Sequence, residues 1–287
     1  MIKKMIGMTF AGFLICVFFY AACQLWCQES EYWEGSSFYK ELEVLVSMPE
    51  QKMMPDASQA LQISATRSLA SEEKITTPAP SGVEEPVYAY PDIIWPQIDF
   101  ATLKQINPDI VGWLYCDGTR LNYPIVQGQD NEQYLSQMYD GSQNETGCPF
   151  LDAENAADFS DRHSIIYAHN RKDGSMFGEL VLFKKQDYYQ VHPQILLITE
   201  TARYVVEIFS GHVARSDSGA WKIEFADTDE YAAWQDVHYA RSSIVTGIIP
   251  QPQERILTLS TCSYEFSEAR YVLHGVLHKA AGSLVEK

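Results

Sequence analysis

The sequence has no pattern that repeats at a fixed period of roughly 20–50 residues and no sustained heptad series, which excludes solenoids and coiled coils. Basic residues are scarce: 21 Lys and Arg stand against 38 Asp and Glu, and the formal net charge is −17. Nucleic acids are bound through basic side chains that neutralise phosphates, so nucleic acid is excluded as the main partner. With 46% hydrophobic residues, the 287-residue chain can still fill the core of one globular domain.

Cysteine is sparse as well. Three of the six cysteines fall in an apolar stretch at the amino terminus, and the others are Cys116, Cys148 and Cys262. Three widely spaced thiols are too few for a disulfide scaffold. Their odd number leaves at least one of them free within the chain, and that thiol needs either burial or a chemical role.

One long hydrophobic run is present near the amino terminus. Lys3 and Lys4 precede an uncharged stretch over 5–27, about 23 residues, which as a helix is long enough to span a bilayer core of roughly 30 Å. A cleaved signal peptide has a shorter apolar region. The sequence therefore predicts a transmembrane anchor over 1–27, with a cytoplasmic amino terminus and the remainder of the chain extracellular. The alternative to an uncleaved anchor is a lipoprotein-like cleavage motif that ends at Cys23, with lipidation of this cysteine.

Residues 28–92 differ in composition from the rest of the chain. They are acidic and rich in proline, serine and threonine, as expected of a solvated tether. Aromatic and leucine residues between Trp33 and Leu45 predict one amphipathic helix within this segment. The sequence thus divides into the anchor, an acidic stalk over 28–92 and one folded domain over 93–287.

The folded domain is predicted to be mostly β. An amphipathic helix capped by Asp99 opens it, and two further helices are predicted over 176–183 and 229–241. Short apolar or alternating runs bounded by turn residues predict the strands. These runs cover 111–115, 121–126, 163–168, 194–199, 204–212, 255–261 and 271–278. So many strands with so few helices favour a closed barrel over a doubly wound sheet.

The segment over 255–277 is the most informative for function and is predicted to be strand, loop, strand. Alternation along the first strand places Cys262 on the face opposite the core-facing leucines, and Arg270 has the corresponding place on the second strand. The two side chains are thus expected side by side at the mouth of the hairpin. A nearby guanidinium favours the thiolate, the nucleophilic form of cysteine. Taken alone, a free cysteine is more often a small buried hydrophobe.

A third residue, His169, follows the predicted strand over 163–168 and could act as general acid and base for Cys262. The other histidines are scattered, and none has the HExxH spacing of a zinc site. The sequence therefore predicts no metal site. The predicted catalytic residues are His169, Cys262 and Arg270.

The motifs around these residues resemble those of sortases, the membrane-anchored cysteine transpeptidases of Gram-positive bacteria. Thr258-Leu-Ser-Thr-Cys262 matches the family's TLxTC signature, and Arg270 follows eight residues later. Tyr167-Ala-His-Asn170 resembles the YGHN run of class B members, with alanine in place of glycine. Further runs agree with class B, so the resemblance covers roughly 93–280. Cys148 departs from the pattern, since relatives usually carry a small polar residue there.

The resemblance implies an eight-stranded sortase-type β-barrel with an N-terminal helical extension and a long helix before the strand that leads to Cys262. It implies that Cys262 attacks the substrate carbonyl, that His169 transfers protons, and that Arg270 stabilises the oxyanion or holds the substrate backbone. Neither a metal nor an organic cofactor is implied. The residues that it implies for the substrate groove are Asn131, Leu135 and Ser260.

The implied activity is cleavage of a C-terminal sorting signal in secreted proteins between Thr and the next residue. The acyl group is then transferred to the amine of a peptidoglycan precursor in the cell wall. The signal is expected to be NPxTN-like or (S/N)PxTG-like. Two enzymatic alternatives stay open: a sortase that polymerises pilins through a lysine amine, and a thiol peptidase that releases surface proteins by using water. A catalytically idle binding module is a third alternative, which the intact catalytic residues disfavour.

Overall fold

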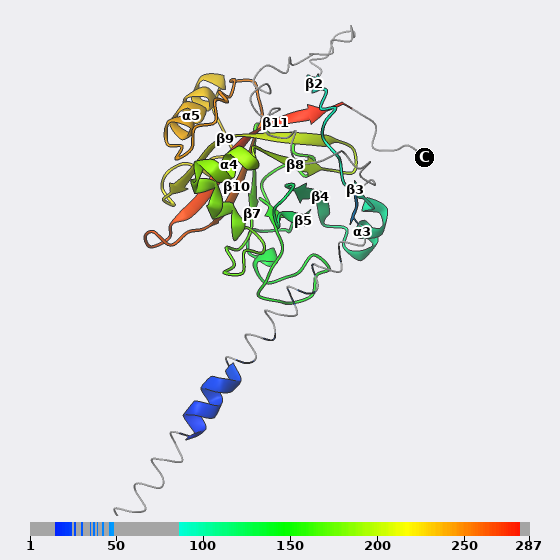
Figure 1. Ribbon diagram of the computed structural model, residues 1–287, viewed down its shortest axis with the longest axis vertical. Coiled ribbons are helices and arrows are strands. Elements are labelled where there is room, and N and C mark those ends of the chain that lie inside the picture. Colours follow the sequence, from blue (N-terminus) through cyan, green and yellow to red (C-terminus); the bar gives the residue numbers. More distant parts are fainter. Residues whose placement is uncertain are drawn as a thin grey trace, which may run out of the picture.

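The computed structural model describes residues 15–24, 26, 30, 35, 37, 39, 42, 46–48 and 86–281. Their fold is mostly β, with strands that form one large sheet closed on itself and a few helices around it (Figure 1). Eight strands make up the closed ring, in the order β10-β7-β6-β5-β4-β8-β9-β11, and antiparallel pairing of β11 with β10 completes it. The eight-stranded barrel predicted from the sequence is therefore confirmed.

Most neighbours in the ring are antiparallel, but β7 runs parallel to β10, and β6 runs parallel to β5. The strands of the ring are β4 (Ile110–Tyr115), β5 (Asn122–Val126), β6 (Phe150–Leu151), β7 (His163–Tyr167), β8 (Gln194–Ile198), β9 (Arg203–Ala214), β10 (Ile256–Cys262) and β11 (Arg270–Ala280). The parallel contact between β7 and β10 matters most for function, because it brings two distant segments to the same end of the barrel.

Among the described residues, three two-residue strands lie outside the ring. β2 (Val87–Tyr88) pairs with β11, while β1 (Val46–Ser47) pairs with β3 (Gln97–Ile98). Near β1, the side chains of Tyr39 and Leu42 are buried in the main core. Parts of the segment predicted as a stalk therefore pack against the barrel, and the rest of that segment lies outside the described residues.

α3 (Phe100–Ile106) and α5 (Thr228–Ala240) each begin after an aspartate. Asp99 accepts a hydrogen bond from the Thr102 amide at 2.9 Å, and Asp227 accepts one from the Glu230 amide at 2.8 Å. These bonds satisfy N–H groups that the first turn of a helix leaves unpaired. The helix predicted over 229–241 is found as α5, which covers the outer side of the barrel near β9 (Figure 1).

α5 buries an aromatic face against the barrel wall. Its Tyr231 and Trp234 form a second core with Phe209 of β9, Ile256 of β10 and Val276 of β11. Both faces of these strands are therefore covered, which is why six of the seven positions of β10 are buried. The half-exposed exception is Cys262, at the end of the strand.

Two helical segments and one strand of the ring differ from the prediction. The helix predicted over 176–183 is a 3₁₀ helix, η4 (Glu179–Lys184), and the helix that follows it, α4 (Gln186–Val191), is not indicated by the sequence pattern. β6 is absent from the predicted strands. It has two residues, too few for an alternating pattern to be recognised.

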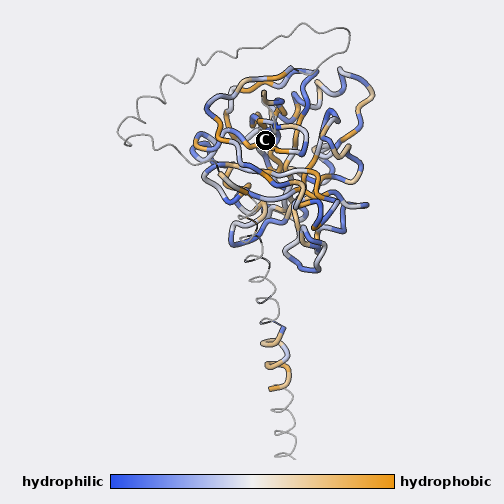
Figure 2. The backbone as a smooth tube through the Cα atoms, turned by 90° about the vertical axis from the view of Figure 1, so that its right-hand side faces the viewer, coloured by the Kyte–Doolittle hydropathy of each residue, from blue (hydrophilic) through white to orange (hydrophobic). Residues whose placement is uncertain are grey.

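The predicted anchor over 1–27 falls largely outside the described residues. Its described part over 15–24 is helical and mainly hydrophobic (Figure 2). Within the described part of the chain, no helix is long and apolar enough to cross a membrane. This finding contradicts the single-pass membrane location and the membrane contact through an N-terminal helix that the apolar run predicted.

His163 is fully buried beneath α5. Its ring lies 4.4 Å from the Trp234 ring, its Nδ1 is 2.7 Å from the Lys222 carbonyl oxygen, and its Nε2 is 2.6 Å from the Thr258 hydroxyl. Burial lowers the pKa of His163 from 6.5 to about 4. The ring is therefore neutral in the folded protein at pH values where the unfolded chain already binds a proton.

The free energy of unfolding is expected to fall as the pH drops from 6.5 to about 4, because the unfolded state binds more protons in this window. Above it, His163 is neutral in both states and contributes no pH dependence. The His163→Gln variant should lose up to about 3 kcal/mol of this pH dependence. Urea denaturation near pH 7 and near pH 4 measures the free energy of unfolding at both pH values. A chelator is present to keep metal ions from binding to the histidines. A free energy of unfolding in His163→Gln that depends on pH as steeply as in the unaltered protein would contradict the account.

Candidate active site

The β10–β11 hairpin brings the predicted nucleophile and the predicted arginine together. Cys262 is directly paired with Arg270 in the antiparallel register. Directly paired residues point to the same face of a sheet, so the thiol and the guanidinium leave the barrel side by side. Both side chains are half-buried. The side-by-side placement predicted from alternation is thus found in the structure.

The end of β7 lies next to Cys262 on the other side. β7 and β10 run parallel, and the last pair in their register is Ser260 with Tyr167. Beyond it, the Ala168 amide donates to the Ser260 carbonyl at 3.2 Å, and the Thr261 hydroxyl donates to the Ala168 carbonyl at 2.7 Å. Extended by two positions beyond its last pair, this register would bring the backbone of His169 next to Cys262.

The segment after β7 is also held to the cysteine's backbone. The side-chain amide of Asn170 donates to the Cys262 carbonyl at 2.7 Å. This contact fixes the loop that carries His169 relative to the strand that carries the thiol. Asn170 is a positioning residue that the sequence reasoning did not single out, although it stands in the motif around His169.

The His169 ring has a defined partner. Its Nε2 lies 2.7 Å from the carbonyl oxygen of Leu135, in the 3₁₀ helix η3 (Gln133–Leu135). A carbonyl oxygen only accepts, so Nε2 carries the proton and donates it to this bond. In the neutral ring, the basic lone pair is consequently on Nδ1. The imidazole, which is half-buried, thus combines a fixed orientation with one free basic nitrogen.

The thiols of the barrel differ sharply in their surroundings. Cys116 and Cys148 are 1% and 2% exposed, whereas Cys262 is half-buried. Burial raises the pKa of Cys116 to about 12 and raises that of Cys148 further. A thiol is nucleophilic only as the thiolate, so these two side chains act as small core residues. The Cys148 thiol donates a hydrogen bond to the Pro124 carbonyl, with the sulfur 3.7 Å from the oxygen.

The loop that follows Cys262 is held by hydrogen bonds within the loop and by contacts with η4. The Ser263 amide donates to the Ala269 carbonyl at 2.8 Å, which closes the loop between the two strands. Lys184 of η4 forms an ion pair with Glu265 and donates to the Ser263 hydroxyl at 3.1 Å. The hydrogen bonds that the Glu265 carboxylate accepts from Lys184 and from the Ser263 hydroxyl lower its pKa to about 2, the bond from Lys184 having the larger effect. These contacts limit the conformational freedom of the backbone next to the Cys262 thiol.

The three residues predicted for the substrate groove lie in different surroundings. Leu135 is 39% exposed and its carbonyl holds His169. Asn131 is exposed, but its side chain bonds to Asp152 at 3.0 Å and to the Ala153 amide at 2.8 Å. Ser260 is 2% exposed, and its hydroxyl accepts from the Trp221 indole at 2.9 Å. Their role in substrate binding stays a prediction.

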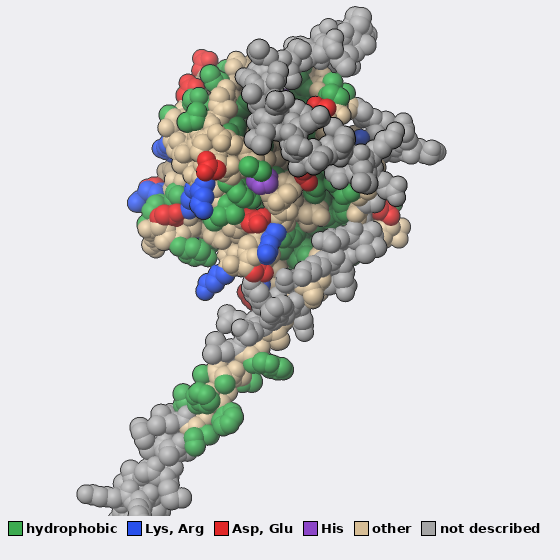
Figure 3. Space-filling model, viewed as in Figure 1, with side chains coloured by type: hydrophobic (Ala, Val, Ile, Leu, Met, Phe, Trp, Pro, Cys, Tyr) green, Lys and Arg blue, Asp and Glu red, His purple; other side chains and the backbone are tan. Residues whose placement is uncertain are grey.

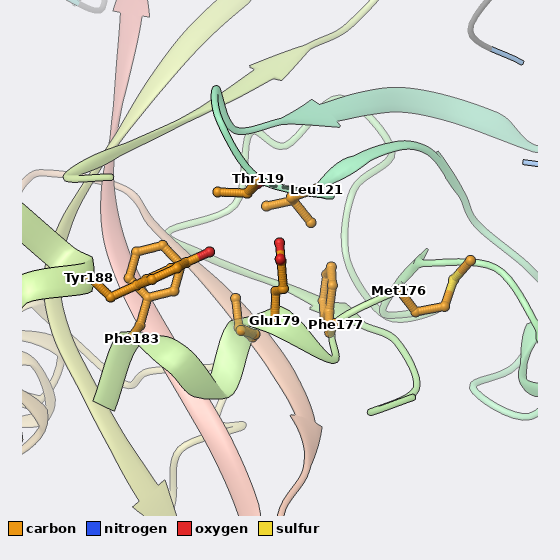
Figure 4. A pocket seen from close by; sticks show the side chains of 8 residues that line it. Thr119, Leu121, Met176, Phe177, Glu179, Phe183 and Tyr188 are labelled. Carbon is orange, nitrogen blue, oxygen red and sulfur yellow. Dashed lines mark hydrogen bonds between the residues drawn. The ribbon is translucent and has the colours of Figure 1, made fainter. Parts of the chain in front are cut away.

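A shallow pocket lies at another place on the barrel, lined by residues of the β4–β5 turn, η4 and α4. It is mainly apolar, and the Glu179 carboxylate extends into it toward the β4–β5 turn (Figure 4). Glu179 also accepts from the Arg120 amide at 2.7 Å. None of the predicted catalytic residues lines this pocket, so it is separate from the candidate active site. Across the face of the domain in Figure 3, acidic, basic and hydrophobic side chains are interspersed.

Comparison with known proteins identifies this arrangement. Residues 114–278 match the model of the sortase domain. Sortase B of Listeria monocytogenes is 34% identical over 177 residues, which cover 61% of this chain and 72% of that protein. Sortase B of Staphylococcus aureus is 31% identical over 169 residues, covering 59% of this chain and 69% of that protein.

Solved structures agree with these relatives. The sortase B–substrate complex of Staphylococcus aureus has a TM-score of 0.60 at 31% identity, covering 63% of this chain and 84% of that one. Sortase B of B. anthracis in complex with AAEK1 has a TM-score of 0.58 at 35% identity, covering 63% and 84%. The chain belongs to the sortase family and is a cysteine transpeptidase. Within that family, its relatives place it in class B.

Proposed function

We propose that this class B sortase cleaves the C-terminal sorting signal of secreted proteins between Thr and the next residue, and joins the new carboxyl end to an amine of a peptidoglycan precursor. The signal is NPxTN-like or (S/N)PxTG-like. The observation that carries the proposal is the pairing of Cys262 with Arg270 at the open end of a hairpin, with the segment bearing His169 bonded alongside.

The reaction proceeds in two acyl transfers. The Cys262 thiolate attacks the carbonyl carbon of the Thr residue, and the peptide C–N bond breaks as a thioester forms. His169 gives a proton to the departing amine and later removes one from the incoming amine, whose nitrogen replaces sulfur on the acyl carbon. Arg270 donates hydrogen bonds to the oxyanion of each tetrahedral intermediate.

Two of the similar structures support the kinds of substrate. One is described as a complex of sortase B with its substrate, and another as sortase B complexed with triglycine. The latter shares 30% identity with this chain and has a TM-score of 0.60. A glycine peptide presents a primary amine on a flexible backbone, the chemistry that an acyl acceptor in the cell wall requires.

A peptide assay tests the proposal. The full chain is incubated with peptides containing NPxTN, NPxTG or SPxTG signals, with and without triglycine, and the products are identified by mass spectrometry. We expect cleavage after Thr and a product that contains triglycine. A product with a free carboxyl group in the presence of triglycine would indicate a hydrolase. A product formed only with a lysine-containing peptide would indicate a pilin polymerase, and either result contradicts the proposal.

Arg270→Lys is expected to lower kcat/KM by about 100-fold although the charge is kept. The planar guanidinium donates two hydrogen bonds in fixed directions, which an ammonium group does not reproduce at an oxyanion. Arg215→Lys is the matched control, because Arg215 is exposed and pairs with Asp217 at 3.2 Å. The control should retain activity within about twofold, since exposed ion pairs contribute little. Near-normal turnover by Arg270→Lys would show that the reaction does not use the two hydrogen bonds of the planar guanidinium.

A further inference from the structure

Three histidines that are far apart in the sequence meet beneath α5. His212 lies on β9, His238 on α5 and His274 on β11, and all three are buried. One ring nitrogen from each lies within 4.8 Å of the other two. The ring centroids are 4.9, 5.2 and 5.3 Å apart. Their spacing in the sequence indicates no metal site, since the fold alone brings them together.

The hydrogen bonds around His274 fix its tautomer. The Lys222 carbonyl only accepts, so His163 carries its proton on Nδ1 and presents a lone pair at Nε2. The Thr258 hydroxyl therefore donates to His163 Nε2 at 2.6 Å and accepts from His274 Nδ1 at 2.6 Å. A neutral His274 then has a lone pair on Nε2, and this buried atom has no hydrogen-bond partner among the described residues.

The same reasoning applies to His212. The hydroxyl of Ser210 donates its one proton to the backbone carbonyl of His238 at 2.6 Å. Its oxygen can then only accept from His212 Nδ1, which lies 3.4 Å away. The proton of the neutral His212 ring is thus on Nδ1, and Nε2 carries the lone pair.

His238 completes the set. Its Nδ1 lies 3.3 Å from His212 Nε2, within hydrogen-bond distance. Because His212 Nε2 carries a lone pair, His238 Nδ1 donates its proton to that nitrogen when the site holds no cation. A cation bound among the three rings would replace this proton, which can move to Nε2 of His238 because both ring nitrogens can carry it. One nitrogen of each ring is then available to the cation.

The side chains of all three histidines are at most 4% exposed, and burial disfavours the charged form of an imidazole. Neutral imidazole is the form that binds metal ions. The outer hydrogen bonds of His274 to Thr258 and of His212 to Ser210 orient these two rings, as is usual for metal-binding histidines.

We propose that His212, His238 and His274 form a binding site for one divalent transition-metal ion of the zinc type. Zn–N bonds of about 2.0–2.1 Å in tetrahedral geometry place nitrogens about 3.3 Å apart, the distance already found between His212 and His238. Three imidazoles favour zinc, cobalt, nickel or copper over magnesium or calcium. The ion would connect α5 to β9 and β11, and thereby hold the helix on the wall that leads to the active site.

Metal binding by the full chain tests the proposal. The protein is treated with a chelator, dialysed against zinc chloride or cobalt chloride at about one equivalent, and analysed for bound metal. We expect one zinc per chain, a midpoint of thermal unfolding that rises with zinc concentration, and cobalt absorption bands of a tetrahedral nitrogen site. Absence of bound zinc would overturn the proposal. So would a thiolate-to-cobalt charge-transfer band, because it would place the ion on a cysteine.

Variants locate the ion. His238→Gln and His274→Gln are each expected to weaken zinc binding by about 100-fold or more. His278→Gln is the matched control, because His278 is buried on the same strand, outside the cluster, and should leave one zinc bound. Zinc retained at full affinity by both cluster variants would overturn the proposal. If either variant fails to fold, the cobalt spectrum of the unaltered chain still decides between nitrogen and sulfur ligands.

Discussion

Replacing Cys262 by alanine is expected to lower transpeptidation by about 10⁴-fold or more, the scale of loss when a catalytic nucleophile is deleted. Without sulfur, no thioester forms, and the backbone at this position offers no other nucleophile. The fold should persist, since the side chain is half-buried and its strand is paired on both sides. Steady-state turnover of a sorting peptide with triglycine measures the loss, and the near-UV circular dichroism spectrum checks the fold.

Cys116→Ala serves as the matched control for this variant. Cys116 is 1% exposed and its sulfur lies 3.4 Å from the Gln194 carbonyl, in the core. Its removal should cost stability through a small cavity but leave activity within about threefold. Substantial turnover by Cys262→Ala, or a comparable loss in Cys116→Ala, would show that the reactive thiol has been assigned to the wrong residue.

His169→Ala is expected to lower kcat by about 10³-fold. The departing amine then leaves without a proton, and general acid–base catalysis typically contributes factors of about 10²–10⁴. The variant also loses the hydrogen bond from His169 Nε2 to the Leu135 carbonyl, which lies at the surface, so its effect on folding should be small. The pH–rate profile should lose the limb that belongs to the imidazole.

The control for this variant is His192→Ala. His192 ends α4, and its Nδ1 lies 2.9 Å from the Asp117 carbonyl, next to the turn between β4 and β5. It should retain both the rate and the shape of the pH profile. Added imidazole is expected to restore part of the activity of His169→Ala. A normal rate and an unchanged pH profile in His169→Ala would show that the His169 imidazole takes no part in the reaction.

Local patterns were sufficient to predict the hairpin of the active site. Period-two alternation and one loop between Cys262 and Arg270 determine which side chains share a face, and the register follows. Leu257 and Leu259 enter the main core together with Tyr271 and Leu273, as that alternation predicts. The barrel itself could be expected because its longer strands have clear boundaries.

Other features depend on tertiary packing that no local pattern shows. Alternation places His212 and His274 on the same outer face, but their meeting with His238 requires α5 to dock on that wall. The partner of His169, Leu135, belongs to a three-residue 3₁₀ helix with no periodic signal. The sequence also indicated a membrane-spanning helix that the described residues do not contain.

The central claim is that Cys262 takes over the acyl group of the substrate. Intact-protein mass spectrometry after rapid mixing with a sorting peptide, in the absence of any acceptor amine, tests it most directly. The account predicts a covalent adduct equal to the peptide up to and including Thr, located on Cys262 by proteolytic mapping and released by triglycine. Cleavage of the peptide with no adduct, or with the adduct on Cys116 or Cys148, would contradict it.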